Sequence, residues 1–307
     1  MKSLVTLRNS VKVSDMTGFG KTTIGFVLVG FSTSLPELSV AFFAVVNPEN
    51  VGVSIGNVLG SNIVNIALIL GVCILIIVLK HPRFPSFQLA VAKEEMGSLQ
   101  FGLFIASIIP LALLYIGYAS RYIGVILVGI FVFYMIQLAR VNRIKEAPSL
   151  PSEKKRLRGY ASFALVGAAL VIATAFFVVE SASTIAVGVG IPPVVIGATI
   201  IAFGTSIPEF ATSVSSARKG HFDLALGNIV GSGFINITLI LGVALIGSPL
   251  NVNIAAFSNL ALFSLIVNLF LWYFLGSGKM SWREGAIFLA LYAAFLVISF
   301  GGLNTQG

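Results

Sequence analysis

Nine apolar runs, each long enough to cross a lipid bilayer, dominate this 307-residue sequence. A helix needs about 20 apolar residues to span the hydrocarbon core of a bilayer. The runs cover approximately residues 22–46, 51–79, 98–117, 121–140, 160–185, 190–217, 222–247, 255–276 and 282–302. Only 10% of the residues are charged, whereas a soluble domain carries about a quarter. The sequence therefore predicts an all-α integral membrane protein and excludes a water-soluble globular domain.

Basic residues predict the orientation of the chain, because Lys and Arg gather in cytoplasmic loops. If the basic stretch 140–158 is cytoplasmic, alternation of the spans places 18 of the 19 Lys and Arg residues on that side. They lie in residues 1–21, 80–97, 140–158, 218–221 and 277–283, and only Arg121 falls outside. We therefore expect a cytoplasmic N-terminus and an external C-terminus.

Several functional classes are not expected from this composition. The net charge of +8 resides in the loops, without a basic face interleaved with aromatic residues, so no nucleic-acid partner is predicted. The single cysteine, Cys73, offers no disulfide and no cysteine metal site. The spans hold no pairing of a nucleophile with a base, and both His81 and His221 fall in predicted loops. We expect neither an enzyme nor a cofactor.

An internal repeat defines the architecture. Residues 24–37 (IGFVLVGFSTSLPE) align with 196–209 (IGATIIAFGTSIPE), and 55–65 (IGNVLGSNIVN) align with 226–236 (LGNIVGSGFIN). The offsets of 172 and 171 indicate one unit used twice. The two leading helices are spans one and six, so the copies have opposite orientation. The sequence predicts an inverted-topology repeat, in which broken helices of the two halves meet near the membrane midplane.

Two glutamates are candidates for the functional site. Glu37 and Glu209 lie in the middle of a span at the same repeat position, whereas the other acids lie in or beside loops or near a span end. An ionisable group at that depth costs several kcal/mol unless it is paired or faces water or an ion. The alternative is a protonated glutamate that is hydrogen-bonded to a neighbouring helix.

A proline precedes each of these glutamates. Pro36 and Pro208 cannot donate to the helical hydrogen-bond ladder, so carbonyls around residues 32–33 and 204–205 are released. The backbone oxygens of Thr33 and Thr205, together with both carboxylates, would form an all-oxygen cage of the kind that Ca²⁺ prefers. A simple proline kink is the alternative interpretation.

Polar side chains recur in the second motif at positions i, i+4 and i+8, so each trio lies on one helix face. The trios are Asn57, Ser61 and Asn65 in the first half and Asn228, Ser232 and Asn236 in the second. Helix packing through small residues and interhelical hydrogen bonds is one explanation. A polar pathway or additional ion sites are the other, and we favour it for Asn65 and Asn236 more than for Asn57 and Asn228.

Charge suggests how such a site would work. Two close carboxylates in a desolvated site favour uptake of protons or monovalent cations, and one divalent ion neutralises both. Either kind of cation neutralises the two carboxylates, whereas the empty, charged site does not reorient easily across the membrane. This is the behaviour expected of an exchanger.

The motifs STSLPE (32–37), GTSIPE (204–209) and the paired GN…GS…N blocks resemble the two alpha-repeats of the cation/Ca²⁺ exchanger superfamily, on its prokaryotic Na⁺/Ca²⁺ exchanger side. The resemblance implies that Glu37, Glu209, Thr33 and Thr205 bind Ca²⁺. It also implies that Na⁺ sites or the ion pathway are formed by Ser34, Ser206, Ser61, Ser232, Asn65, Asn236, Gly30 and Ala202. The implied function is exchange of Ca²⁺ for Na⁺ by alternating access, in a prokaryotic plasma membrane.

Some features depart from the family pattern. Ser32 replaces the usual glycine of the first motif, and Asn236 stands where Na⁺/Ca²⁺ exchangers often carry aspartate. The second departure gives H⁺ more weight as the alternative counter-ion. The family has ten helices, including a long sliding pair; 160–185 matches its second member, and the first is either lost or lies upstream of Met1.

The resemblance divides the chain into a first half (1–140), a basic cytoplasmic linker (141–159) and a second half (160–307). Two functions of other kinds remain open. A passive cation channel would use the same glutamates as a selectivity ring without coupling. A membrane protein that binds Ca²⁺ without transporting it is the other.

Overall fold

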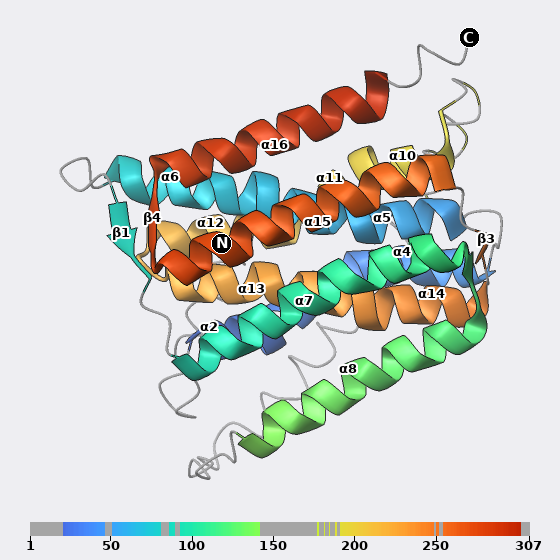
Figure 1. Ribbon diagram of the computed structural model, residues 1–307, viewed down its shortest axis with the longest axis horizontal. Coiled ribbons are helices and arrows are strands. Elements are labelled where there is room, and N and C mark those ends of the chain that lie inside the picture. The colour runs from blue at the N-terminus through green and yellow to red at the C-terminus, as the bar shows by residue number, and fades with distance from the viewer. Residues whose placement is uncertain are drawn as a thin grey trace.

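The computed structural model describes residues 21–46, 51–80, 86–89, 93–141, 177, 181, 184, 188, 191–248, 250–251 and 254–301. These residues form helices and two small β-ribbons (Figure 1). Apart from single residues, the predicted linker 141–159 and the predicted span 160–185 lie outside the described residues, as does His81.

Both halves contain the same succession of helices. The first half comprises α2 (Lys21–Ile24), η1 (Gly25–Val29), α3 (Gly30–Thr33), α4 (Leu35–Val46), α5 (Val51–Ile63), η3 (Val64–Leu70), α6 (Gly71–Lys80), α7 (Lys93–Ile116) and α8 (Arg121–Val141). The second comprises α10 (Pro193–Ile196), η5 (Gly197–Ile201), α11 (Ala202–Thr205), α12 (Ile207–Arg218), α13 (Phe222–Ile235), η6 (Asn236–Ile240), α14 (Leu241–Gly247), α15 (Ile254–Ser277) and α16 (Trp282–Gly301). The η segments are wider π-helical turns that continue the neighbouring helices.

The helices agree with the predicted apolar runs wherever the structure describes them. Five continuous helices are long and apolar enough to cross a membrane: Val51–Lys80, Met96–Ile116, Phe222–Gly247, Phe257–Ser277 and Trp282–Phe300. Two more runs are broken helices, bent by 48° between Thr33 and Leu35 and by 47° between Thr205 and Ile207. Arg121–Gln137 is a shorter apolar helix. Because 160–185 is not described, the count of nine spans stays a prediction.

The two β-ribbons reveal the inverted relation of the halves. Strand β1 (Ser86–Gln88) pairs with β4 (Lys279–Ser281), and β2 (Tyr118–Ala119) pairs with β3 (Leu250–Asn251), both antiparallel. Strand β1 follows α6, and β3 follows its counterpart α14, yet the two strands lie at opposite ends of the molecule (Figure 1). Equivalent points of the two halves are thus at opposite ends, as an inverted repeat requires.

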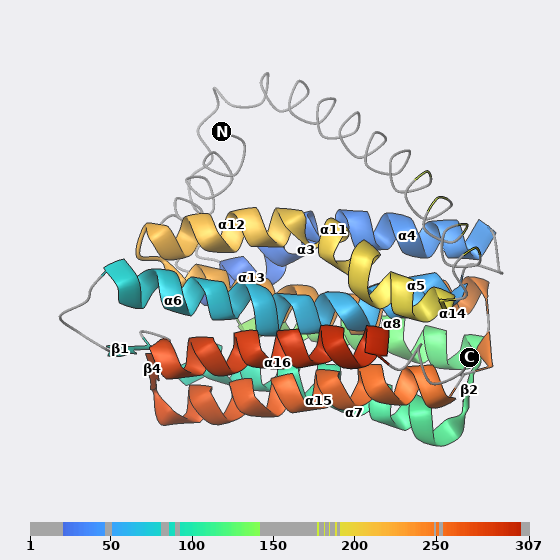
Figure 2. The ribbon, with the colours of Figure 1, turned by 90° about the horizontal axis from the view of Figure 1, so that it is seen from above.

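The helices form layers whose axes run roughly along the long axis of the molecule. The broken helices, with α4 and α12, line one face; α5, α6, α13 and α14 lie in the middle; and α7, α15 and α16 cover the other face (Figure 2). Two repeat-related glycines allow the broken helices to approach the middle layer closely. A methyl group on Gly60 would overlap the backbone of Ala198, and one on Gly231 would overlap the backbone of Phe26. Each contact joins one half of the chain to the other.

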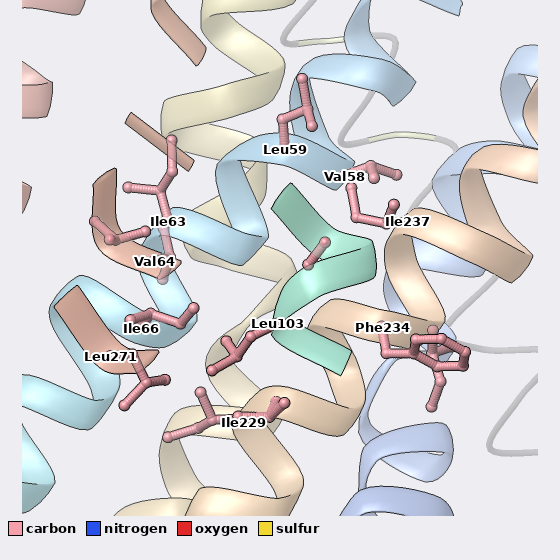
Figure 3. Close-up of a cluster of buried hydrophobic side chains, with 14 of the residues drawn as sticks. Val58, Leu59, Ile63, Val64, Ile66, Leu103, Ile229, Phe234, Ile237 and Leu271 are labelled. Carbon is pink, nitrogen blue, oxygen red and sulfur yellow. The ribbon is translucent and has the colours of Figure 1, made fainter. Parts of the chain in front are cut away.

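A continuous apolar core holds the middle layer against the covering helices. It includes Leu59 and Ile63 of α5, Phe234 of α13 and Leu103 of α7, each no more than 1% exposed (Figure 3). Burial of such side chains contributes roughly 1.5–3 kcal/mol each in water, and in lipid the equivalent stabilisation comes from close packing. This packing fixes the positions of the helices that carry the polar residues described next.

Candidate ion site

Each broken helix is interrupted at the same repeat position. Ser34 (φ −81°, ψ 10°) ends α3 and Ser206 (φ −80°, ψ 5°) ends α11, both outside the helical region. Pro36 and Pro208 occupy the second position of the helices that follow, where a missing N–H is tolerated. The nearly identical angles give two equivalent breaks, as the sequence motifs predicted.

The two predicted glutamates lie directly after these breaks. Glu37 is in the first turn of α4 and Glu209 in the first turn of α12, and both are 0% exposed. The partial positive charge of a helix N-terminus stabilises a carboxylate at this position. The break therefore places an acidic side chain, and the start of a helix that favours it, inside the protein.

Serines from both halves donate to each carboxylate. The Oγ atoms of Ser61 and Ser206 lie 3.4 and 3.5 Å from Glu37 Oε1. The Oγ atoms of Ser232 and Ser34 lie 3.3 and 3.4 Å from Glu209 Oε1. Each glutamate thus has one serine from its own half and one from the other, so the site lies where the repeats meet.

The second oxygen of each carboxylate has no such partner. Oε2 of Glu37 and Oε2 of Glu209 are buried and accept no hydrogen bond. In the described part of the chain, the side chains that donate to the two glutamates bear hydroxyl groups, and none is basic. Buried negative charge without a basic partner requires a cation or a proton. The arrangement is suited to holding a positively charged guest.

Threonine and asparagine form a second pair of contacts between the halves. Thr205 Oγ1 donates to Asn57 Oδ1 at 2.9 Å, and Thr33 Oγ1 lies 3.2 Å from Asn228 Oδ1. The amide nitrogen of Asn228 donates in turn to Ser213 Oγ at 2.9 Å. The structure thereby places Thr33 and Thr205 beside the breaks, each with its hydroxyl group within hydrogen-bond distance of an asparagine of the opposite half.

The remaining predicted residues occupy the same buried region. Asn65 and Asn236 are fully buried, and none of their side-chain amide atoms has a hydrogen-bond partner. The carbonyl oxygens of Gly30 and Ala202 accept from the backbone N–H groups of Ser34 and Ser206 at 3.0 and 3.1 Å. Side-chain hydroxyl groups lie near the same two carbonyls: Thr33 Oγ1 is 3.2 Å from Gly30 O, and Thr205 Oγ1 is 3.3 Å from Ala202 O.

The structure shows contacts of Asn57 and Asn228 that the sequence did not indicate, and it adds Ser213, which sequence analysis did not single out. The motif spacing indicated that the asparagines share a face with Ser61 and Ser232, but not which groups they meet. Ser213 lies four residues after Glu209, one helical turn further along α12. That spacing is the signal by which it could have been found.

Comparison with known proteins agrees with the repeat architecture. The profile of the sodium/calcium exchanger protein family matches residues 3–139 and 160–301. The sodium/calcium exchanger MaX1 of Methanosarcina acetivorans is 32% identical over 96% of this chain and 93% of its own length. The inner membrane protein YrbG of Escherichia coli is also 32% identical, over 83% of this chain and 79% of its own.

Solved structures have the same fold. The sodium-calcium exchanger NCX_Mj, soaked with 2.5 mM Na⁺ and 10 mM Sr²⁺, matches with a TM-score of 0.72 and 27% identity, over 95% of this chain and 91% of that one. The same exchanger without Na⁺ and Ca²⁺ matches with a TM-score of 0.67. The doubled motif, the inverted halves and these matches together establish that the chain is an integral membrane protein of the sodium/calcium exchanger family.

Proposed function

We propose that the protein is a secondary active antiporter that exchanges Ca²⁺ for Na⁺ by alternating access. The observation that carries this proposal is the pair of buried carboxylates, one from each inverted half, whose hydrogen-bonding partners are hydroxyl groups of both halves. A site shared between halves can open to either side when the halves move against each other. The same ligands then face one side of the membrane and afterwards the other.

In this proposal Ca²⁺ lies between Glu37 and Glu209. Two bidentate carboxylates supply four oxygens, and the carbonyls of Thr33 and Thr205 bring the number to six, the lower end of the usual range for Ca²⁺. The unpartnered Oε2 atoms of both glutamates are the first ligands available. The charges of the ion and the carboxylates then cancel, which reduces the cost of holding the ion at membrane depth.

Na⁺ would occupy positions around the same carboxylates when Ca²⁺ is absent. Its further ligands in this proposal are hydroxyls, carboxamides and backbone carbonyls close to the glutamates. They belong to Ser34, Ser206, Ser61, Ser232, Asn65, Asn236, Gly30 and Ala202. Because one set of carboxylates serves both ions, loading with one excludes the other, and that competition couples the two fluxes.

The names of the relatives support Na⁺ as the counter-ion. MaX1 and NCX_Mj are both called sodium/calcium exchangers, and each matches more than nine-tenths of this chain. H⁺ is the alternative, since protonation of two neighbouring carboxylates also neutralises the site. Asn236 bears on this choice because an aspartate there would add a third acid.

Radioactive Ca²⁺ uptake into proteoliposomes tests the proposal. We expect uptake when the vesicles contain Na⁺ and the bath does not, and uptake near background when Na⁺ is equal on both sides. Uptake that is driven only by an outward H⁺ gradient would show that the counter-ion is H⁺ and not Na⁺. Flux independent of both gradients would instead identify a channel, and Ca²⁺ binding without flux would exclude transport.

We also propose that the protein resides in the plasma membrane with the β1–β4 end facing the cytoplasm. Both strands lie in loops that carry Lys or Arg, and such loops stay in the cytoplasm. The hydrogen bond from Lys80 Nζ to the Arg218 carbonyl, at 2.8 Å, joins the loop that contains β1 to a third basic loop, residues 218–221. We expect the variant Gln88→Cys to be labelled by a membrane-impermeant thiol reagent in inverted vesicles and not in intact cells.

A further inference from the structure

Asn57 and Asn228 contact the threonines at the breaks rather than the carboxylates. Thr205 ends α11 and Thr33 ends α3, and each is followed by the serine at which the helix is interrupted. The asparagine in each contact comes from the opposite half, 148 and 195 residues away in the chain. The end of each broken helix is therefore bonded to a continuous helix of the other half.

This contact determines what the threonine can offer an ion. A hydroxyl group has one hydrogen, so a threonine that donates to asparagine does not donate to another acceptor at the same time. The bond also restricts the side-chain rotamer of a β-branched residue that is already limited at χ1. A fixed side chain and helix end in turn constrain the position of the adjacent peptide carbonyl.

We propose that Asn57 and Asn228 are positioning residues, which hold Thr205 and Thr33 so that the threonine carbonyls face the ion. The inference rests on the proposed function, because it concerns the geometry of that Ca²⁺ site. Neither asparagine is a ligand in this account. Each acts through a hydroxyl group and controls the opposite half of the site.

The two contacts are not equivalent. The amide of Asn228 is anchored by Ser213, whereas Nδ2 of Asn57 has no partner, and the repeat counterpart of Ser213 is Ala41. For Thr205 the nearest acceptor is Asn57, at 2.9 Å, with Ala202 O at 3.3 Å. For Thr33 the nearest acceptor is its own-helix carbonyl, Val29 O at 3.0 Å, and Asn228 is at 3.2 Å. Thr205 thus depends more on its asparagine, so Asn57 contributes more to the site than Asn228.

A double-mutant cycle on KM for Ca²⁺ separates positioning from packing. Asn57→Ala and Thr205→Val should each raise KM about tenfold, because either change removes the same hydrogen bond. The double variant should show the same tenfold rise and no more. Thr205→Ser restores the hydroxyl group and should return KM to within about twofold of the wild type. Asn228→Ala should raise KM less than Asn57→Ala does.

Two matched variants serve as controls. Thr199→Val removes a threonine hydroxyl on the same broken helix that donates to its own-helix carbonyl, Val195 O. Asn62→Ala removes a buried asparagine of α5 whose amide donates to Ser264 of α15. Both should leave KM for Ca²⁺ unchanged even if they lower the melting temperature.

Three results would overturn the inference. Additive effects of Asn57→Ala and Thr205→Val would show that the asparagine does not act through the threonine. An unchanged KM in the single variants would show that the contact does not position the site. A wild-type protein that takes up no Ca²⁺ would remove this inference together with the proposed function, whereas the first two results would leave the proposed function intact.

Discussion

At the scale of single residues, charge at positions 37 and 209 is the property on which the proposed transport depends. Glutamine has the shape of glutamate and keeps one acceptor oxygen, but it cannot neutralise Ca²⁺. We expect Glu37→Gln or Glu209→Gln to abolish Ca²⁺ uptake while the protein remains folded, as judged by its elution profile and melting temperature. Glu284→Gln, at the β1–β4 end beside Ser281, is the control and should retain uptake. Near-normal uptake by either site variant would contradict the assignment.

Asn236 offers a second test at this scale, because its side-chain amide is buried with both polar atoms unpartnered. Asn236→Asp adds a third acid to the site, and a further negative charge favours binding of monovalent cations that share it. We expect a steeper dependence of Ca²⁺ uptake on the Na⁺ gradient in this variant. The same Na⁺ response in variant and wild type would count against Asn236 as part of the ion site.

The side-chain amide of Asn228 has a hydrogen-bond partner and that of Asn57 has none, and this difference predicts a stabilising substitution. Ala41→Ser would supply the hydroxyl group that Ser213 supplies in the other half, and a buried amide that gains a partner stabilises a protein by about 1 kcal/mol. Thermal unfolding in detergent should show a higher melting temperature for Ala41→Ser and a lower one for Ser213→Ala. A lower melting temperature for both would mean that position 41 lacks the geometry of position 213.

At the scale of elements, close contact between α5 and the broken helix of the other half depends on Gly60. Gly60→Ala should lower the melting temperature and the monodisperse fraction in detergent, because its methyl group would overlap the Ala198 backbone, which cannot rotate away. Gly52→Ala on the same helix is the control, since no atom lies within 4 Å of the added methyl group. Equal stability of the two variants would contradict this packing.

Helices and helix breaks could be predicted where nearby residues alone determine them. Apolar runs of adequate length gave the helices, and Pro36 and Pro208 gave the positions of the two breaks. The π-helical turns at Gly25–Val29 and Gly197–Ile201 could not be predicted, because a shift in hydrogen-bond register depends on packing against neighbouring helices. The β-ribbons were missed for a similar reason: their strands have two or three residues and pair across the halves.

The same distinction applies to the candidate site. Glu37 and Glu209 stood out because isolated acids in apolar runs are costly and rare. The contacts of Asn57, Asn228 and Ser213 were not apparent, since a helical face shows which residues point together but not which helix they meet. Contacts between residues more than 140 positions apart depend on how the two repeats pack against each other. The sequence indicates that the repeats meet, but not which side chains come into contact.

At the scale of the whole molecule, the two ribbons join the halves at both ends. Strand β1 belongs to the first half and β4 to the second, and the opposite end repeats this with β2 and β3. Because a ribbon joins α7 to α15 at each end, the distance and angle between these two helices are held constant. We infer that these helices and their ribbons form a fixed scaffold, against which other helices move during transport.

A disulfide across the first ribbon tests this scaffold. Gln88 and Lys279 are paired and exposed, and the neighbouring Leu89 N–H donates to Gly278 O, so 88 and 279 form the closer, non-hydrogen-bonded type of pair. The Cα atoms of such a pair are about 4.5 Å apart, which is within the range for a disulfide. The native Cys73 is buried and should not interfere. Gln88→Cys with Lys279→Cys should therefore crosslink under mild oxidation.

The effect of this crosslink on transport decides whether the ribbon moves. If the scaffold is fixed, oxidised and reduced forms of the double variant should take up Ca²⁺ at the same Na⁺-driven rate, because no step of the cycle separates β1 from β4. The two single-cysteine variants control for the substitutions and for the oxidant. Loss of uptake on oxidation, reversed by reducing agent, would show that the two halves part at this end. The moving elements would then include α7 and α15, and alternating access would involve the whole of each half.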